Sequence, residues 1–360
     1  MSWIGSWTAY VRGESTGFLC MSPFLKLASI GFHKIAVVRQ KAYENGWLPS
    51  EQMPVPVISV GNVTVGGTGK TPCVSWVAKY LFEAGKSPAV ILRGYGNRIS
   101  GHRVVQPGRV GGEEALLLCE KIPQTLIVEA PHRRLGARAA IMQHGSNVII
   151  LDDGFQHMAI RRNLDLALVD ATCPWGNGAI LPAGILREPR ESLGRADAVI
   201  LTRADLVDTD TLAKLSREIQ SLAPEAIRAT ASHYPSAIRN VTDQCLLGVQ
   251  WLAGRRVGLC SAIGNPKGFA ATVNRLGATV LGHTIFRDHH RYSQQDIEEL
   301  KSRFRDAEAI LCTAKDAVKL RPLLRGKPER KFWVLEIEWR FLSGEEEIGR
   351  LIAEKVRIKK

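Results

Sequence analysis

The stretch Val57–Pro72, VISVGNVTVGGTGKTP, decides the fold of the first half of this chain. An apolar run at Val55–Val60 predicts a buried strand, and apolar residues resume at helical spacing from Val74. Between them lies a glycine-rich turn that ends in Lys70 and Thr71. A strand, a glycine-rich turn and a helix in this order are the context that a phosphate-binding loop requires.

Each residue type in this turn suits phosphate binding. Glycines let backbone N–H groups point inward at phosphate oxygens. Lys70 is expected to reach the β- and γ-phosphates of a nucleotide, and Thr71 to offer a hydroxyl to Mg²⁺. The usual pattern is G-x-x-x-x-G-K-[ST], and Thr64 stands where its first glycine should be. The alternative is a glycine-rich turn that binds nothing. We assign nucleotide binding to Thr64, Val65, Gly66, Gly67, Thr68, Gly69, Lys70 and Thr71.

A second signal is the pair of carboxylates in LDDGFQH, residues 151–157. The run Val148–Leu151 has no polar residue and predicts a buried strand, which Asp152 and Asp153 follow directly. In phosphate-binding-loop enzymes an aspartate in this place holds Mg²⁺ directly or through water. The alternative is a pair of turn or capping residues. We therefore predict Thr71, Asp152 and Asp153 as the metal site.

Along the whole chain, short and continuous apolar runs alternate with amphipathic helical windows. This alternation predicts an α/β fold, a P-loop NTPase-like parallel sheet covered by helices. A length of 360 residues is too long for one ordinary core, so we expect a second, smaller α/β domain. We place the first domain at 46–231 and the second at 232–342.

The chain ends are expected to differ from these domains. Residues 1–45 are predicted to form an amphipathic segment, and 343–360 a C-terminal helix that begins with a capping box of Ser343 and Glu346. The stretch Ser232–Gln250 reads as a linker.

Composition limits the possible partners. The chain is 45% hydrophobic and 23% charged, as in globular proteins, and 48 basic residues against 35 acidic ones give a net charge of +13. This charge implies an anionic partner, which could be nucleic acid, an acidic membrane surface or a phosphorylated substrate. The seven cysteines are scattered with no C-x-x-C pair, as in a reduced cytoplasmic protein without a zinc site.

The N-terminal apolar stretch Phe18–Val38 is interrupted by Pro23, Lys26 and Lys34, so it is too short to span a bilayer. No cleavage site of a signal peptide follows it. Two interpretations stay open: an amphipathic helix on an anionic membrane surface, or an ordinary helix packed on the main domain.

Two weaker segments complete the candidates. Arg187, in Leu181–Pro189, could neutralise phosphate charge in the transition state, although an Arg-Glu pair in a loop is more often a surface ion pair. His289, beside Asp288, could accept or orient a proton, although this stretch alone is more typical of a solvated loop.

Taken together, these segments resemble the lipid A 4'-kinase family of Gram-negative bacteria. The resemblance spans nearly the whole chain, in the family's order. LDDGFQH together with a phosphate-binding loop that has Thr for Gly is its most specific part. The segments that carry it are the basic N-terminal stretch, Pro54–Pro72, Arg93–Gly96, LDDGFQH, Leu186–Pro189, Ile263–Pro266, Asp288–His290 and Thr313–Asp316.

The resemblance implies an ATP- and Mg²⁺-dependent kinase on the cytoplasmic face of the inner membrane, bound peripherally. Its partner would be an anionic glycolipid substrate, tetraacyldisaccharide 1-phosphate, with no nucleic acid and no obligate protein partner. The family's fold has two α/β domains, with the C-terminal helix returning to the first. By the same resemblance, the catalytic residues are Glu113, Asp152, Asp153, Arg187, Glu188 and His289.

Two departures from the family's pattern concern carboxylates. The family usually has Gly-Asp-Glu where this chain has Gly112-Glu113-Glu114, and that Asp is the expected base. Glu113 is one methylene longer, and a shift of the alignment by one residue would leave the base to another group. Ala314 stands where the family has Glu.

Three other functional classes are alternatives. The main alternative is a kinase or ligase with the same loop that acts on a soluble metabolite. A nucleotide-driven switch is disfavoured because Thr202–Asp205 and Thr313–Asp316 lack the Asn of a guanine-binding Asn-Lys-x-Asp. A nucleic-acid-binding protein is disfavoured because no zinc finger, aromatic RNP run or basic tract is present.

Overall fold

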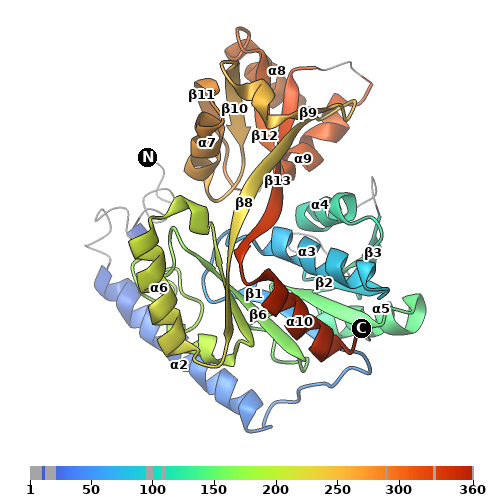
Figure 1. Ribbon diagram of the computed structural model, residues 1–360, viewed down its shortest axis with the longest axis vertical. Helices are drawn as coiled ribbons and strands as arrows, with labels where there is room; N and C mark the ends of the chain where they lie inside the picture. Colours follow the sequence, from blue (N-terminus) through green and yellow to red (C-terminus); the bar gives the residue numbers. More distant parts are fainter. Residues whose placement is uncertain are drawn as a thin grey trace. The chain divides into compact units, whose positions relative to one another are not determined.

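The computed structural model describes residues 10–12, 22–94, 100–106, 111–288, 290–326 and 330–358. Its contacts divide the chain into two compact units, coloured along the sequence in Figure 1. The first unit comprises 1–110, 122–232 and 339–360, and the second comprises 111–121 and 233–338. The chain is therefore α/β throughout, with each unit built from strands and helices.

The first unit is built on a mostly parallel sheet in the order β8-β7-β6-β1-β5-β2-β4-β3. At the end of this order β3 pairs antiparallel with β4, whereas β1, β2, β5, β6 and β7 pair in parallel. The buried, apolar pattern of the central strands explains why the sheet is parallel, because such strands need cover on both faces. The strands are β1 (Val57–Asn62), β2 (Pro88–Leu92), β3 (Arg103–Val105), β4 (Leu126–Glu129), β5 (Val148–Asp152), β6 (Leu164–Asp170), β7 (Ala198–Thr202) and the start of β8 (Ile227–Asn240).

Helices of the first unit pack on this sheet. In one cluster, Ala137 and Ala140 of α5 meet Ile91 of β2 and Leu151 of β5. In another, Leu215 and Ile219 of α6 pack with β6 and β7 residues. The helices are α2 (Ser22–Glu44), α3 (Lys70–Glu83), α5 (Arg133–His144), α6 (Thr209–Leu222), α10 (Glu345–Val356) and the 3₁₀ turns η2 (Arg190–Arg195) and η3 (Ala204–Leu206).

Strand β1 lies between β5 and β6, with every residue buried. Val60 of β1 is in register with Asp152, the last residue of β5. The carboxyl ends of parallel strands meet at one edge of a sheet, where α/β proteins bind ligands. The register therefore brings the residues after β1 and the residues after β5 to the same edge.

The second unit has a smaller parallel sheet, β11-β10-β12-β13, in which β13 neighbours β8 and β9 pairs antiparallel with β8. Phe304, Leu320 and Phe332 belong to its core. Its elements are α4 (Glu113–Lys121), β9 (Leu246–Gly248), η4 (Val249–Leu252), β10 (Arg256–Ser261), α7 (Pro266–Arg275), β11 (Thr279–Ile285), α8 (Gln294–Arg303), β12 (Ala309–Thr313), α9 (Ala314–Leu324) and β13 (Phe332–Ser343).

Two local predictions were wrong. The supposed linker Ser232–Gln250 contains most of β8 and all of β9, because the two strands pair with each other within a stretch too polar to read as a strand. The capping box is absent: Gly344 is the N-cap of α10, in a left-handed conformation, and the Ser343 hydroxyl pairs with that of Thr230 at 2.7 Å.

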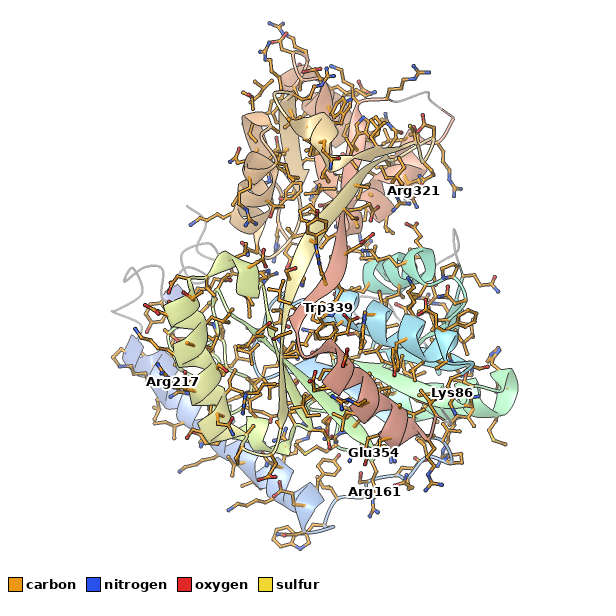
Figure 2. All side chains as sticks on the ribbon, in the orientation of Figure 1. Lys86, Arg161, Arg217, Arg321, Trp339 and Glu354 are labelled. Carbon is orange, nitrogen blue, oxygen red and sulfur yellow. The ribbon has the colours of Figure 1, made fainter. Side chains whose placement is uncertain are left out.

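An aromatic cluster joins α10 and the end of β13 to α3. Trp76 and Tyr80 of α3 stack, Trp76 meets Phe341 edge-on, and Phe341 meets Trp339, which is labelled in Figure 2. The Tyr80 hydroxyl donates to the Gly349 carbonyl at 2.9 Å. The C-terminal helix thus packs on the helix that starts at Lys70.

Candidate phosphate-binding site

The loop between β1 and α3 has the backbone that its glycines allow. Gly66 and Gly69 have φ of 114° and 90°, a region that residues with a side chain rarely adopt. Thr64 does not need this freedom, because it forms an antiparallel bridge with Leu186. The threonine in place of the first glycine is therefore compatible with the loop, since its backbone is extended and paired.

The segment that pairs with this loop leads to Arg187. The Val65 amide donates to the Ile185 carbonyl, and the Arg187 amide donates to the Val63 carbonyl, both at 2.7 Å. We call Ala179–Arg187 the strap. Its position beside the phosphate-binding loop explains why an arginine so distant in sequence lies at this edge of the sheet.

The turn after β5 presses against β1. Asp153 has a φ of 51°, and the Gly154 amide donates to the Val60 carbonyl at 3.1 Å. A Cβ at Gly154 would lie 2.7 Å from Leu151 Cβ, and a Cβ at Gly61 would lie 2.6 Å from Phe155 Cβ. Both glycines are required by this close approach, which fixes where the carboxylates project.

Lys70, Asp153 and Arg187 form one charge cluster. Arg187 Nη1 donates to both carboxylate oxygens of Asp153, at 2.9 and 2.8 Å, and Lys70 Nζ lies 3.5 Å from Asp153 Oδ1. Burial favours the neutral acid, but Lys70, Arg187 and Arg133 outweigh it and lower the pKa of Asp153 to about 2. Asp153 is therefore an anion at every physiological pH.

Asn62 and Gln156 are polar side chains of the site that received no role from the sequence. Asn62 is fully buried; its Oδ1 accepts from Lys70 Nζ at 3.4 Å and its Nδ2 donates to the Thr64 hydroxyl at 3.3 Å. Gln156 Nε2 donates to the Asn62 carbonyl at 2.8 Å, and Gln156 Oε1 accepts from Arg187 at 3.2 Å. Asn62 lies in the glycine-rich stretch Val57–Pro72 and Gln156 lies in LDDGFQH, and this placement could have identified them as site residues.

Arg133 and Arg203 were also missed, and no local pattern marks them. Arg133 Nη2 donates to the Asp152 carbonyl at 2.9 Å, and burial lowers the pKa of its guanidinium. Arg203 Nη2 donates to the Gly67 carbonyl at 2.7 Å, and Arg203 also pairs with Asp170. Two arginines thus hold the backbone of the two motifs.

The predicted residue Glu188 takes a different partner from its neighbour Arg187. Glu188 is buried, and its Oε2 accepts from Arg195 Nη2 at 2.7 Å. Arg195 in turn lies over the Phe155 ring, 4.6 Å from its centroid. The Glu188 carboxylate therefore pairs with Arg195 of η2 and not with the charge cluster.

The other candidate residues lie in the second unit. Glu113 is the first residue of α4, and its Oε2 lies 3.4 Å from Lys319 Nζ of α9. Glu114 pairs with Lys315 at 2.7 Å. His289 lies outside the residues that the structure describes.

Asp316 organises the motifs of the second unit. Its carboxylate is fully buried and accepts from the Ala262 amide and the Tyr292 hydroxyl, both at 3.0 Å, and from the Thr313 hydroxyl at 2.6 Å. Burial raises its pKa. Asp316 thereby ties together Ala262 directly after β10, Tyr292 before α8 and Thr313 at the end of β12.

Comparison with known proteins decides the family. The model of the LpxK family, tetraacyldisaccharide-1-P 4'-kinase, matches residues 21–357. The chain belongs to this family. A tetraacyldisaccharide 4'-kinase of Anaeromyxobacter sp. strain K is 36% identical over 92% of this chain and 90% of its own length. One from Syntrophus aciditrophicus is 34% identical over 88% of this chain and 93% of its own length.

A solved structure extends the likeness to the fold. The crystal structure of LpxK from Aquifex aeolicus in complex with ATP has a TM-score of 0.73 and 28% identity, and the match covers 94% of this chain and 98% of that one. The predicted fold class and the predicted family are therefore confirmed. The phosphate-binding loop described above is part of the first unit of this kinase family fold.

Proposed function

We propose that this protein transfers the γ-phosphate of ATP to the 4'-hydroxyl of tetraacyldisaccharide 1-phosphate in lipid A biosynthesis. The observation that carries the proposal is the cluster of Lys70, Asp153 and Arg187 beside a glycine-rich loop, in a chain of the tetraacyldisaccharide-1-P 4'-kinase family. Phosphoryl transfer needs positioning and positive charge more than covalent chemistry, and this cluster supplies both.

Mg²⁺ fits the residues at this edge of the sheet. Asp152 ends β5, Asp153 follows it directly, and Thr71 lies in the first turn of α3, so two carboxylates and a hydroxyl offer the oxygen ligands that Mg²⁺ prefers. The Thr68 hydroxyl is buried without a hydrogen bond to any described residue, so it is able to donate to a phosphate oxygen bound by the loop. Among described residues no group of three or more His, Cys, Asp or Glu forms a metal cage, and Mg²⁺ in kinases rests on one or two carboxylates plus phosphates. The metal would neutralise charge on the β- and γ-phosphates.

The residues of the first unit then divide the work. Lys70 holds the β- and γ-phosphates, and Arg187 stabilises charge as the bond from the γ-phosphorus to the bridging oxygen breaks and ADP leaves. Asp153 is a poor proton acceptor, because an effective general base has a pKa near the working pH and that of Asp153 is about 2. It suits a metal ligand instead.

We assign the proton of the attacking 4'-hydroxyl to Glu113. Its position in the family's pattern supports this assignment, and its ion pair with Lys319 orients the carboxylate. The hydroxyl oxygen attacks the γ-phosphorus while Glu113 accepts its proton. We propose His289 as a further member of the site by resemblance only.

The partner surface that we propose is an anionic bilayer, the cytoplasmic face of the inner membrane. Phe24, Leu27, Ile35 and Val38 of α2 follow one another at helical spacing and are exposed, with Leu27 70% and Ile35 69% accessible. Exposed basic side chains flank them, and each contributes about 1 kcal/mol near an anionic surface. These are Lys26, Lys34, Arg39 and Lys41. Among described residues no helix is long and apolar enough to cross a membrane.

The deciding experiment is transfer from γ-labelled ATP to purified tetraacyldisaccharide 1-phosphate in detergent micelles. We expect labelled lipid from the native chain and none from Lys70→Ala. Lys79→Ala is the matched control, because Lys79 lies on the same helix and makes only an exposed pair with Glu83. Intact ATP hydrolysis without labelled lipid would reject the acceptor and favour a soluble substrate.

A further inference from the structure

The two faces of α2 have different surroundings. Its apolar outer side is exposed at Leu27 and Ile35, whereas Ser29 is buried. The Ser29 hydroxyl accepts from the Ala183 amide at 3.0 Å. Its single proton has two acceptors within reach, the Ile180 carbonyl at 2.7 Å and the Leu25 carbonyl of α2 at 2.9 Å, and the strap carbonyl is the nearer. A helix that only anchored the chain would not need a buried polar contact to the strap.

The strap carries this contact to the phosphate-binding loop. Within it, the Leu181 amide donates to the Leu186 carbonyl at 2.8 Å, and Ile180 forms a β-bridge with Leu186. Leu186 is itself bridged to Thr64 of the loop. Hydrogen bonds and β-bridges therefore link Ser29 through Ile180 and Leu186 to Val63 and Val65, which flank Thr64. The residue after Leu186 in the strap is Arg187.

A second contact reaches the acidic motif. Arg39 lies further along α2 than Ser29. Its Nη2 donates to the Gln156 carbonyl at 3.3 Å. The Gln156 side chain contacts Arg187 and the Asn62 carbonyl. One helix thus touches both segments that surround the Lys70, Asp153 and Arg187 cluster.

We infer that Ser29 is a positioning residue that couples lipid contact at α2 to nucleotide binding at the phosphate-binding loop. The inference rests on the proposed contact of α2 with an anionic bilayer. Lipid that fixes the outer face of α2 would restrict the helix, and the hydrogen bonds of Ser29 would transmit this restriction to the strap. Coupling between two sites is reciprocal, so ATP should also tighten lipid contact by the same factor.

The test measures binding of a fluorescent ATP analogue with and without vesicles of equal parts phosphatidylethanolamine and phosphatidylglycerol that contain no acceptor lipid. In the native chain we expect saturating vesicles to tighten the Kd about fivefold, the low end of typical coupling. Ser29→Ala should sediment with vesicles as the native chain does but show no change in Kd. Ser29→Thr, which keeps the hydroxyl, should restore the response.

Leu27→Gln is the matched control on the outer face. It should weaken sedimentation with vesicles and leave the Kd measured without vesicles unchanged. If Ser29→Ala does not fold, Ser29→Cys, which keeps the volume and weakens the hydrogen bonds, allows the same comparison.

A vesicle response that persists in Ser29→Ala would overturn the inference, and so would a native chain that sediments with vesicles without any change in Kd. A native chain that does not sediment would remove both the membrane contact and the coupling. Phosphate transfer in detergent judges the proposed kinase activity separately, since it needs no bilayer.

Discussion

Arg187 Nη1 donates to both carboxylate oxygens of Asp153, at 2.9 and 2.8 Å, although the two residues come from different motifs 34 positions apart. Lys70 lies 3.5 Å from the same carboxylate. One anion therefore holds two cations at the edge of the sheet where the phosphate-binding loop begins. Under the proposed function, these cations would already be gathered where the charge of the ATP phosphates has to be neutralised.

Replacing Arg187 by alanine should lower kcat about 100- to 1,000-fold, because a donor aimed at developing charge contributes about 3–4 kcal/mol to the transition state. The measurement is steady-state transfer to the lipid acceptor. Arg190→Ala is the control, since Arg190 makes a comparable ion pair with Glu218 at 2.6 Å, about 40% exposed. A kcat of Arg187→Ala within a few-fold of the native value would remove Arg187 from the reaction.

Because of Asp153, the free energy of unfolding should depend on pH in the acid range. Its folded-state pKa of about 2 lies below its ordinary value of 3.8, so its stabilisation is complete above the ordinary value and is lost as the pH falls through the folded one. The full contribution is about 2 kcal/mol, with about half lost by pH 3. Urea unfolding of the native chain and Asp153→Asn at pH 5 and pH 3 measures it. Equal losses in both chains would contradict the cluster.

Glu188→Gln should act on stability more than on chemistry. The Glu188 carboxylate is buried and bonded to Arg195, so its loss leaves the half-buried Arg195 guanidinium without its counter-charge. We expect about 2–3 kcal/mol in unfolding free energy, below the cost of breaking a fully buried pair because Arg195 is partly exposed. Glu83→Gln, from the exposed pair with Lys79, should change stability by less than about 1 kcal/mol. If Glu188→Gln kept the native unfolding free energy but lost most of its kcat, Glu188 would instead act at the phosphate site.

Gly61→Ala should disturb the acidic motif from within β1. The new Cβ would lie 2.6 Å from the Cβ and backbone nitrogen of Phe155, so the turn that carries Asp153 must move. We expect a loss of about 1–3 kcal/mol in stability and a lower kcat. In Gly31→Ala a Cβ meets nothing within 4 Å, and helix propensity should make that variant more stable by up to about 1 kcal/mol. An unchanged Gly61→Ala would mean that the turn does not rest on β1.

The sequence by itself determined much of the α/β pattern. Continuous apolar runs and helical spacing are local signals, and they located β1 and β5 within a few residues. The glycine-rich loop and LDDGFQH were recognisable for the same reason, because each motif is complete within one short segment. The strand β8 was missed because its pairing with β7 and β9, rather than its own composition, makes it a strand.

Only the tertiary structure decided which side chains meet. Arg187 and Glu188 are neighbours in sequence, yet Arg187 contacts Asp153 and Glu188 contacts Arg195. Arg133 and Arg203 reach the two motifs from 19 and 136 positions away, distances over which no periodicity operates. Nothing in the sequence near Ser29 marks it, and its contact with the Ala183 amide of the strap is visible only in the folded chain. The sequence determines local conformation through short-range sterics and hydrogen bonding. Which side chains meet in a site depends on how the strands, helices and loops pack in the folded chain.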